Sequence, residues 1–193
     1  MPTLLWINAC VRGKDSRTLE LSKQLLSEIK EQNQTDLAFQ IEEVRLTTEN
    51  LLPLNYERLQ RREELLEQKC FTDTMFDYAN AVAAADMIVI SAPFWNMSFP
   101  AVLNIFLEAA SVQGITFDYA QDGTPIGLCH ASDLYFVTTS GGIIGDCNFG
   151  FQYLHALSKL YGIEHVHFVS AQGLDMEQAN TEQILAAATI QDY

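Results

Sequence analysis

Residues 87–104, MIVISAPFWNMSFPAVLN, decide the fold because they join a buried strand to a helix through an aromatic loop. The apolar run 87–90 is short and continuous, which is typical of a strand covered on both faces in a parallel sheet. A proline ends the run, and helical spacing of apolar residues begins at about Phe99. Ligands of open α/β sheets bind beyond the carboxyl ends of such strands, so the loop predicts a site for a flat, mostly apolar ligand. The loop residues are Pro93, Phe94, Trp95, Asn96 and Met97.

The composition is that of an acidic globular protein. The chain has 193 residues, of which 48% are hydrophobic and 19% are charged. These values favour one α/β domain that spans residues 1–193. The net charge of −14 argues against binding to nucleic acid or to an anionic membrane surface. Since no segment approaches the roughly 20 apolar residues of a transmembrane helix, we expect neither a nucleic-acid nor a membrane partner.

The cysteines and histidines give no signal of a metal site. The four cysteines are scattered, with no C-x-x-C pair and no zinc-like spacing: Cys10, Cys70, Cys129 and Cys147. This usage, together with an N-terminus unlike a signal peptide, predicts reduced thiols in a cytoplasmic protein. His165 and His167 alternate on an expected strand, where no further ligand is evident, so we expect them to pack or to face solvent.

Strand and helix signals alternate along the whole chain. We expect strands over residues 3–9, 38–46, 86–91, 133–138 and 164–170. We expect helices over residues 16–30, 57–69, 72–85, 99–111, 149–161 and 176–190, and a surface excursion with a D-G turn over 114–127. This order predicts a parallel sheet with helices on both faces. Five strands favour a flavodoxin-like three-layer α/β/α fold with strand order 2-1-3-4-5.

Three loops of that fold are expected to border one crevice, because the chain leaves strands 1 and 3 in opposite directions. They cover residues 10–18, 93–97 and 139–147. The first loop enters a helix through Ser16-Arg17-Thr18, where free N–H groups and hydroxyls suit a phosphate. The third begins Thr139-Ser140-Gly141-Gly142, and its glycines allow the backbone to approach a ring closely. Helix capping alone explains Ser16, and a tight connection alone explains the glycines, but the coincidence of three such loops favours a ligand site.

These loops carry a pattern that is similar to a known family. The segment 91–104, SAPFWNMSFPAVLN, resembles the A-P-[MF]-[YW]-N-[FM]-x-[IF]-[PS] signature of the FMN-dependent NADH azoreductases, also called FMN-dependent NADH:quinone oxidoreductases. The similarity continues in the same order through L-N-I-F-L-E, G-I-T-F-D-Y, T-T-S-G-G-I and L-Y-G-I. The resemblance implies a flavodoxin-like homodimer with one FMN per subunit near the interface. It also implies NADH or NADPH as electron donor and a quinone, azo dye or nitroaromatic as acceptor.

The resemblance assigns roles to the three loops. The FMN phosphate is assigned to Ser16, Arg17 and Thr18. The isoalloxazine ring is assigned to Pro93, Phe94, Trp95, Asn96 and Met97, and its pyrimidine end to Thr139, Ser140, Gly141 and Gly142. No catalytic side chain is implied, because hydride transfer requires no general acid or base.

Three positions depart from the family pattern. Cys10 stands where a serine often touches the phosphate, and a thiol is a poorer hydrogen-bond donor than a hydroxyl. Arg17 stands where glutamine is common, and its added cation should favour a phosphate dianion and offset the loss of the serine. Ser140 stands where arginine is common.

Two other functions account for parts of the pattern. A flavodoxin-like electron carrier would bind FMN without turning over NADH, and the acidic surface would suit docking to a basic redox partner. A hydrolase on the same fold would need a nucleophile elbow or an acid/base pair, and the sequence contains no G-x-S-x-G. The surface excursion and the aromatic loop favour the enzyme over the carrier.

Overall fold

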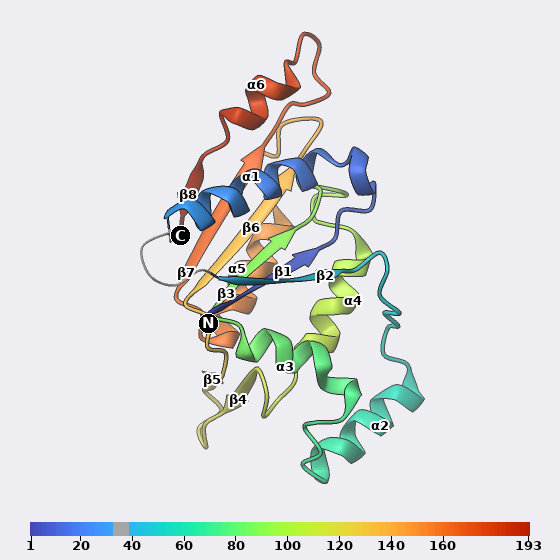
Figure 1. Ribbon diagram of the computed structural model, residues 1–193. Coiled ribbons are helices and arrows are strands. Elements are labelled where there is room, and N and C mark those ends of the chain that lie inside the picture. Colours follow the sequence, from blue (N-terminus) through green and yellow to red (C-terminus); the bar gives the residue numbers. More distant parts are fainter. Residues whose placement is uncertain (33–38) are drawn as a thin grey trace.

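A six-stranded sheet forms the centre of the computed structural model, which describes residues 1–32 and 39–193 (Figure 1). Its strands are β1 (Thr3–Asn8), β2 (Gln40–Arg45), β3 (Met87–Ser91), β6 (Asp133–Thr139), β7 (His165–Ala171) and β8 (Ile190–Asp192). Their order is β2-β1-β3-β6-β7-β8, with β8 antiparallel to β7 and the other pairs parallel. The flavodoxin-like class is confirmed. The expected order holds for the parallel strands, but the expectation of five strands was wrong by one edge strand.

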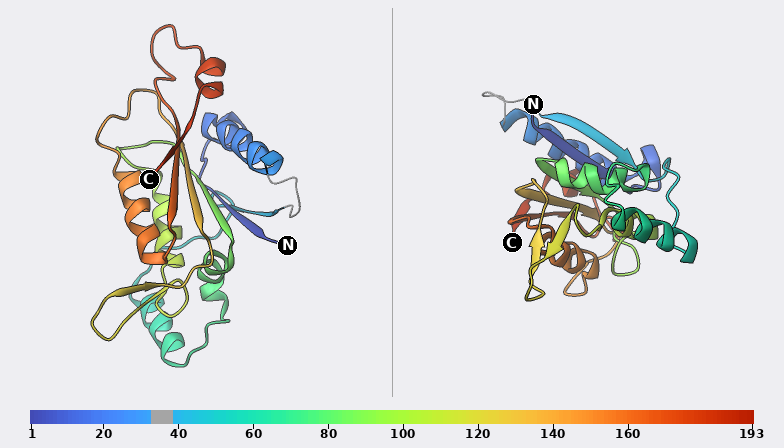
Figure 2. Two further views of the ribbon diagram at one scale, coloured as in Figure 1. Left: turned by 90° about the vertical axis from the view of Figure 1, so that its left-hand side faces the viewer. Right: turned by 90° about the horizontal axis from the view of Figure 1, so that it is seen from below.

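Helices cover both faces of this sheet (Figure 2). One face is covered by α1 (Arg17–Gln32) and α6 (Thr181–Ala186), and the other by α3 (Asp77–Ala84), α4 (Ala101–Ala110) and α5 (Phe149–Tyr161). The remaining helix, α2 (Tyr56–Glu67), lies farther from the sheet, where its Leu65 packs against Phe76 and Ala79. Among the described residues, no helix has the length and apolar character needed to cross a membrane.

Successive side chains of β1 point to opposite faces of the sheet, and they divide the hydrophobic core into two clusters. Leu5 and Ile7 join the cluster formed with α4 and α5, whereas Leu4 and Trp6 join the cluster formed with α1. The same division continues through β3, β6 and β7. Burial on both faces explains why these strands read as continuous apolar runs rather than as alternating ones.

Side-chain caps set the ends of several helices. Asn148 begins α5 by accepting a hydrogen bond from the N–H of Phe151 at 3.0 Å, and Gly162 ends it in the left-handed conformation with φ of 79°. Asn55 begins α2 in the same way, by accepting from the N–H of Arg58. Gly162 is thus the C-cap residue of α5, a position that favours glycine.

The C-terminal segment differs from the single helix expected over 176–190. Gln178 has a positive φ of 70°, which ends any helix there, and Asn180 then caps the short α6. Residues 190–192 form β8, which covers the edge of β7. The alanine-rich composition predicted a helix, but pairing with an open strand edge prevailed.

His167 ties this added strand to the sheet. Its Nε2 lies 2.8 Å from Asp133 Oδ1 on β6, and its Nδ1 lies 2.6 Å from Asp192 Oδ1 on β8. Its ring stacks on Tyr135 with centroids 4.2 Å apart. Partial burial acts to raise the pKa of Asp133, but hydrogen bonds with Ser132 and His167 outweigh it and lower that pKa below its usual value. His167 on β7 is therefore packed between β6 and β8 and makes polar contacts with both of these strands.

Other boundaries shifted by a few residues. The expected helix over 72–85 is a 3₁₀ turn (Thr74–Phe76) followed by α3, and β2 begins at residue 40 rather than 38. Residue 38, the first residue of the strand expected over 38–46, lies outside the described residues. The excursion over 114–127 contains a hairpin of β4 (Phe117–Tyr119) and β5 (Pro125–Gly127), with Gly123 of the expected D-G turn at φ of 83°.

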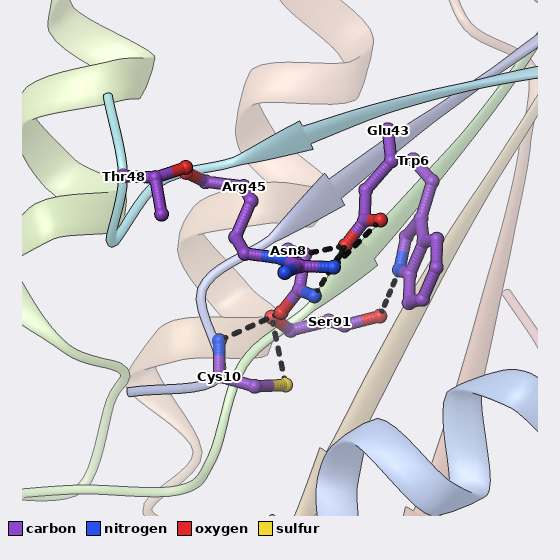
Figure 3. Close-up of polar contacts among 7 residues, drawn as sticks. All are labelled: Trp6, Asn8, Cys10, Glu43, Arg45, Thr48 and Ser91. Carbon is purple, nitrogen blue, oxygen red and sulfur yellow. Dashed lines mark hydrogen bonds and ion pairs between the residues drawn. The ribbon is translucent and has the colours of Figure 1, made fainter. Parts of the chain in front are cut away.

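A polar network fixes the carboxyl end of β1 (Figure 3). Buried Asn8 donates from Nδ2 to Glu43 Oε1 on β2 at 2.8 Å and accepts at Oδ1 from the N–H of Cys10 at 2.9 Å. Arg45 pairs with the same Glu43 carboxylate. Asn8 therefore connects the edge strand to the first residues of the loop that follows β1.

A substitution at Gly127 tests the close packing of the hairpin on α5. A Cβ atom there would lie 2.1 Å from the backbone N of Gly162 and 2.2 Å from the carbonyl carbon of Tyr161. Gly127→Ala should therefore lower the free energy of unfolding by about 1–3 kcal/mol or more, measured by urea denaturation. Gly142→Ala is the matched control, because nothing lies within 4 Å of its Cβ position. Equal stability of the two variants would contradict this packing.

Candidate functional site

A cleft opens at the carboxyl edge of the sheet, where β1, β3 and β6 end. The chain leaves β1 toward the face covered by α1 and leaves β3 toward the face covered by α4, so the loops diverge there. The cleft holds about 600 Å³ of empty space, counting the part open to solvent. It is lined by Arg12, Asp15, Ser16, Arg17, Thr18, Pro93, Phe94, Trp95, Thr139, Gly141 and Asp175.

The loop after β1 directs the start of α1 into this cleft. Ser16 caps the helix, since its Oγ accepts from the N–H of Leu19 at 3.2 Å and its carbonyl accepts from the N–H of Glu20 at 3.1 Å. The first N–H groups of a helix have no partner within it and carry the positive end of the helix dipole. The Thr18 and Thr139 hydroxyls lie 2.6 Å apart and join the first loop to the third. These groups suit an anionic ligand.

Arg17 is already paired. Its Nη1 donates to the carbonyl of Leu174 at 3.1 Å and to Asp175 Oδ1 at 2.8 Å. This pairing holds the pKa of Asp175 below its usual range. A carboxylate from the loop after β7 therefore meets the cation that Arg17 adds to the start of α1.

Cys10 lies beneath the cleft rather than in its lining. The residue is 3% exposed, and its thiol lies 3.8 Å from the carbonyl of Ser91. Burial raises the pKa of the Cys10 thiol to about 11, a hydrogen bond with Ser16 opposes the rise, and the charge of Glu43 adds to it. The thiol is protonated at neutral pH, so it is not poised as a nucleophile.

The loop after β3 is a tight turn. Trp95 and Ser98 exchange two backbone hydrogen bonds of 3.0 and 2.8 Å, and the two residues between them, Asn96 and Met97, have φ of 50° and 62°. Positive φ at both central positions is the geometry of a type I′ turn, which Asn tolerates and Met does not favour. The N–H of Phe149 at the start of α5 donates to the carbonyl of Met97 at 3.0 Å. The turn is thus anchored from outside, and backbone strain is held at the cleft's rim.

The loop after β6 pairs with the loop after β7. The N–H groups of residues 173, 174 and 175 donate to the carbonyls of residues 142, 140 and 141, at 3.0, 3.1 and 2.9 Å. A Cβ atom at Gly141 would lie 2.1 Å from Asp175 Oδ2, so a larger residue there would displace the Asp175 side chain. The Ser140 hydroxyl donates to the carbonyl of Gly142 at 2.5 Å and so turns away from the cleft.

The structure brings most of the expected site residues together. Those that line the cleft are Ser16, Arg17, Thr18, Pro93, Phe94, Trp95, Thr139 and Gly141. Those that lie in the same loops without lining it are Cys10, Asn96, Met97, Ser140 and Gly142.

Three lining residues were missed from the sequence. Arg12 and Asp15 lie within the expected first loop but carry no motif. Asp175 follows the last parallel strand, and its position at the carboxyl edge of the sheet was the only signal that marked it. Within the described ranges, no group of three or more His, Cys, Asp or Glu residues gathers in a way that would hold a metal ion.

Comparison with known proteins identifies the family. The family described as having a flavodoxin-like fold matches residues 2–192. An FMN-dependent NADH:quinone oxidoreductase from Clostridium perfringens is 30% identical over 186 residues, which cover 95% of this chain and 92% of that protein. A protein of the same name from Clostridium beijerinckii is 31% identical over 183 residues, which cover 94% and 90%.

Solved structures share the fold. The crystal structure of an azoreductase from Bacillus anthracis superposes with a TM-score of 0.83 at 20% identity, covering 97% of this chain and 94% of that one. An FMN-dependent NADH-azoreductase from the same species, in complex with FMN, gives a TM-score of 0.80 at 24% identity, covering 96% and 93%. By the family match and the sequence relatives, the chain belongs to the flavodoxin-like family and, within it, to the FMN-dependent NADH:quinone oxidoreductases.

Proposed function

We propose that this protein is an FMN-dependent oxidoreductase that passes two electrons from NADH to quinones, azo compounds or similar flat aromatic acceptors. The observation that carries the proposal is one cleft that is lined both by the start of α1 and by the aromatic side chains of Phe94 and Trp95. The relatives named FMN-dependent NADH:quinone oxidoreductase support the donor, the cofactor and the quinone acceptor, and the azoreductase structures support the azo acceptor.

The donors in the cleft fit a flavin phosphate. Ser16 and Thr18 place hydroxyls beside the free N–H groups at the start of α1, and Arg17 supplies a guanidinium. We propose these three residues as the phosphate site. Cys10 contributes by anchoring the loop through its backbone N–H to Asn8, since its thiol is buried below the lining.

The other end of the cleft fits an aromatic ring system. We propose that Phe94 and Trp95 form the wall, with Pro93, Asn96 and Met97 completing the turn that supports it. Thr139 and Gly141 line the same cleft, and the Asp175 carboxylate takes the space beside Gly141 that a side chain would fill. We propose that the third loop, with Ser140 and Gly142, contacts the pyrimidine end of the ring.

In this reaction the protein binds FMN and the substrates, orients them and excludes water from the cleft. The chemistry that FMN supplies when bound is the acceptance of a hydride from NADH and its delivery to the acceptor. No side chain has to donate or accept a proton for hydride transfer, and the protonated Cys10 thiol is not available as a nucleophile. The rigid backbone pairing of the loops after β3, β6 and β7 holds the walls of the cleft in place.

A homodimer with the cleft at its interface is also proposed. Large apolar side chains stand exposed in the loops around the cleft and along the start of α5: Trp95, Met97, Ile143, Phe149 and Tyr153. Such a cluster on a protein surface is typical of an interaction site. Sedimentation should give a molar mass of twice 21.7 kDa, and a monomeric mass would contradict the dimer.

Two further proposals concern the domain organisation of the chain and the cellular location of the protein. We propose that residues 1–193 form one FMN-binding domain, which the family match over 2–192 supports. We propose a cytoplasmic location because all four cysteines are free thiols.

The optical spectrum of the purified protein tests the enzymatic function. The protein reconstituted with FMN should be yellow, should bleach on addition of NADH and should regain its absorbance on addition of a quinone. NADPH in place of NADH measures the preference for the donor. A protein that binds FMN but is not bleached by either nicotinamide would support the electron carrier instead, and a protein that takes up no FMN would contradict both functions.

Met97→Gly tests whether the strained turn supports the flavin. Glycine adopts positive φ freely, so the substitution should raise the free energy of unfolding of the flavin-free protein by about 0.5–1 kcal/mol. Loss of the thioether from the rim should weaken FMN binding about three- to tenfold.

Lys69→Gly is the matched control for that variant. Lys69 also has a positive φ, of 56°, but it follows α2, away from the cleft. The control should gain similar stability, measured by urea denaturation, and should bind FMN as the wild type does in a fluorescence titration. Unchanged FMN affinity in Met97→Gly would show that Met97 is not part of the ring site.

A further inference from the structure

The Arg17–Asp175 pair lies at the phosphate end of the cleft, and both residues line it. The Arg17 side chain is 27% exposed and the Asp175 side chain 68% exposed. One guanidinium nitrogen, Nη1, serves both Asp175 and the carbonyl of Leu174. The cation that faces the cleft is thus held by protein oxygens from the loop after β7.

Asp175 is held firmly in this position. Its N–H donates to the carbonyl of Gly141 at 2.9 Å, and its carboxylate lies where a side chain at residue 141 would stand. The backbone pairing of residues 140–142 with 173–175 supports it from both sides. The backbone of Asp175 is therefore held in place by the neighbouring loop, and its exposed carboxylate meets Arg17 at the lining of the cleft.

We propose that Asp175 sets how strongly this cleft favours a phosphate-bearing flavin over the same flavin without phosphate, because its carboxylate competes with the phosphate for Arg17. The inference rests on the proposed function and concerns FMN against riboflavin. The phosphate adds negative charge next to a carboxylate, and the two anions share one guanidinium. Arg12 lies close enough for its charge to act on Asp175, and Asp15 adds a second carboxylate to the lining. The two arginines are thus matched by two aspartates, and selection of the phosphate rests mainly on N–H groups and hydroxyls.

Asp175→Asn isolates this charge. Asparagine keeps the shape and a hydrogen-bond acceptor for Arg17, but it removes the competing anion. The dissociation constants for FMN and for riboflavin are measured on the flavin-free full chain by quenching of flavin fluorescence. The variant should bind FMN about two- to fivefold more tightly, the size expected for a partly exposed pair, and should bind riboflavin as the wild type does.

Glu177→Gln is the matched control, since it removes the same charge from an exposed position of the same loop outside the lining. It should leave the FMN-to-riboflavin ratio unchanged. Arg17→Gln should weaken FMN binding more in the Asp175→Asn background than in the wild type, because Arg17 is then free of its competitor. Added salt should likewise weaken FMN binding to Asp175→Asn more steeply than to the wild type.

An unchanged or reduced preference for FMN in Asp175→Asn would overturn the inference while leaving the proposed function intact. A mere loss of loop structure would weaken both flavins alike, so the ratio separates the two explanations. Should Asp175→Asn fail to fold, Asp175→Ser removes the same charge and must shift the ratio in the same direction. Wild-type protein that binds neither flavin would instead overturn the proposed function.

Discussion

Burial of both faces of the parallel sheet is the constraint on which the rest of this structure depends. Side chains of β1 enter one core through Leu5 and Ile7 and the other through Leu4 and Trp6, so most of the strand's side chains are buried. These buried side chains cannot contact a ligand, so a ligand has to bind to the loops at the ends of the strands. The chain leaves β1 and β3 toward opposite faces, and the loops that follow them diverge. The cleft is therefore a consequence of the topology, and the loop residues only determine what it binds.

The electrostatics of the cleft follow from an acidic chain that has to accept an anion. The net charge of −14 opposes a phosphate at long range, and the arginines in the lining stand beside aspartates. Directional donors are less affected by this balance, because the N–H groups at the start of α1 and the hydroxyls of Ser16 and Thr18 act over hydrogen-bond distances. Recognition of phosphate here depends on these directional donors together with the balance of charge between Arg17 and Asp175.

Structural features were predictable from the sequence where they depend on residues that are close together in the chain. The apolar run 87–90 predicted β3, and the loops expected after the first, third and fourth parallel strands follow β1, β3 and β6. Asp175 was missed because its importance arises from contact with Arg17, 158 residues away in the chain. β8 was missed because pairing with the β7 edge is a tertiary effect that overrides an alanine-rich helix signal. The same limit applies to Cys10, whose place beneath the lining depends on packing against residues far from it in sequence.

Two side-chain contacts join the start of α1 to the loops that follow β6 and β7. The Asp175 carboxylate that meets Arg17 occupies the space that a side chain at Gly141 would need. Any larger residue there would displace a charge at the phosphate end while narrowing the ring end. The contact between the hydroxyls of Thr18 and Thr139 is the second link. The two links join the start of α1 to the end of β6 and to the loop after β7, so the groups that line this part of the cleft come from segments held together by side-chain contacts.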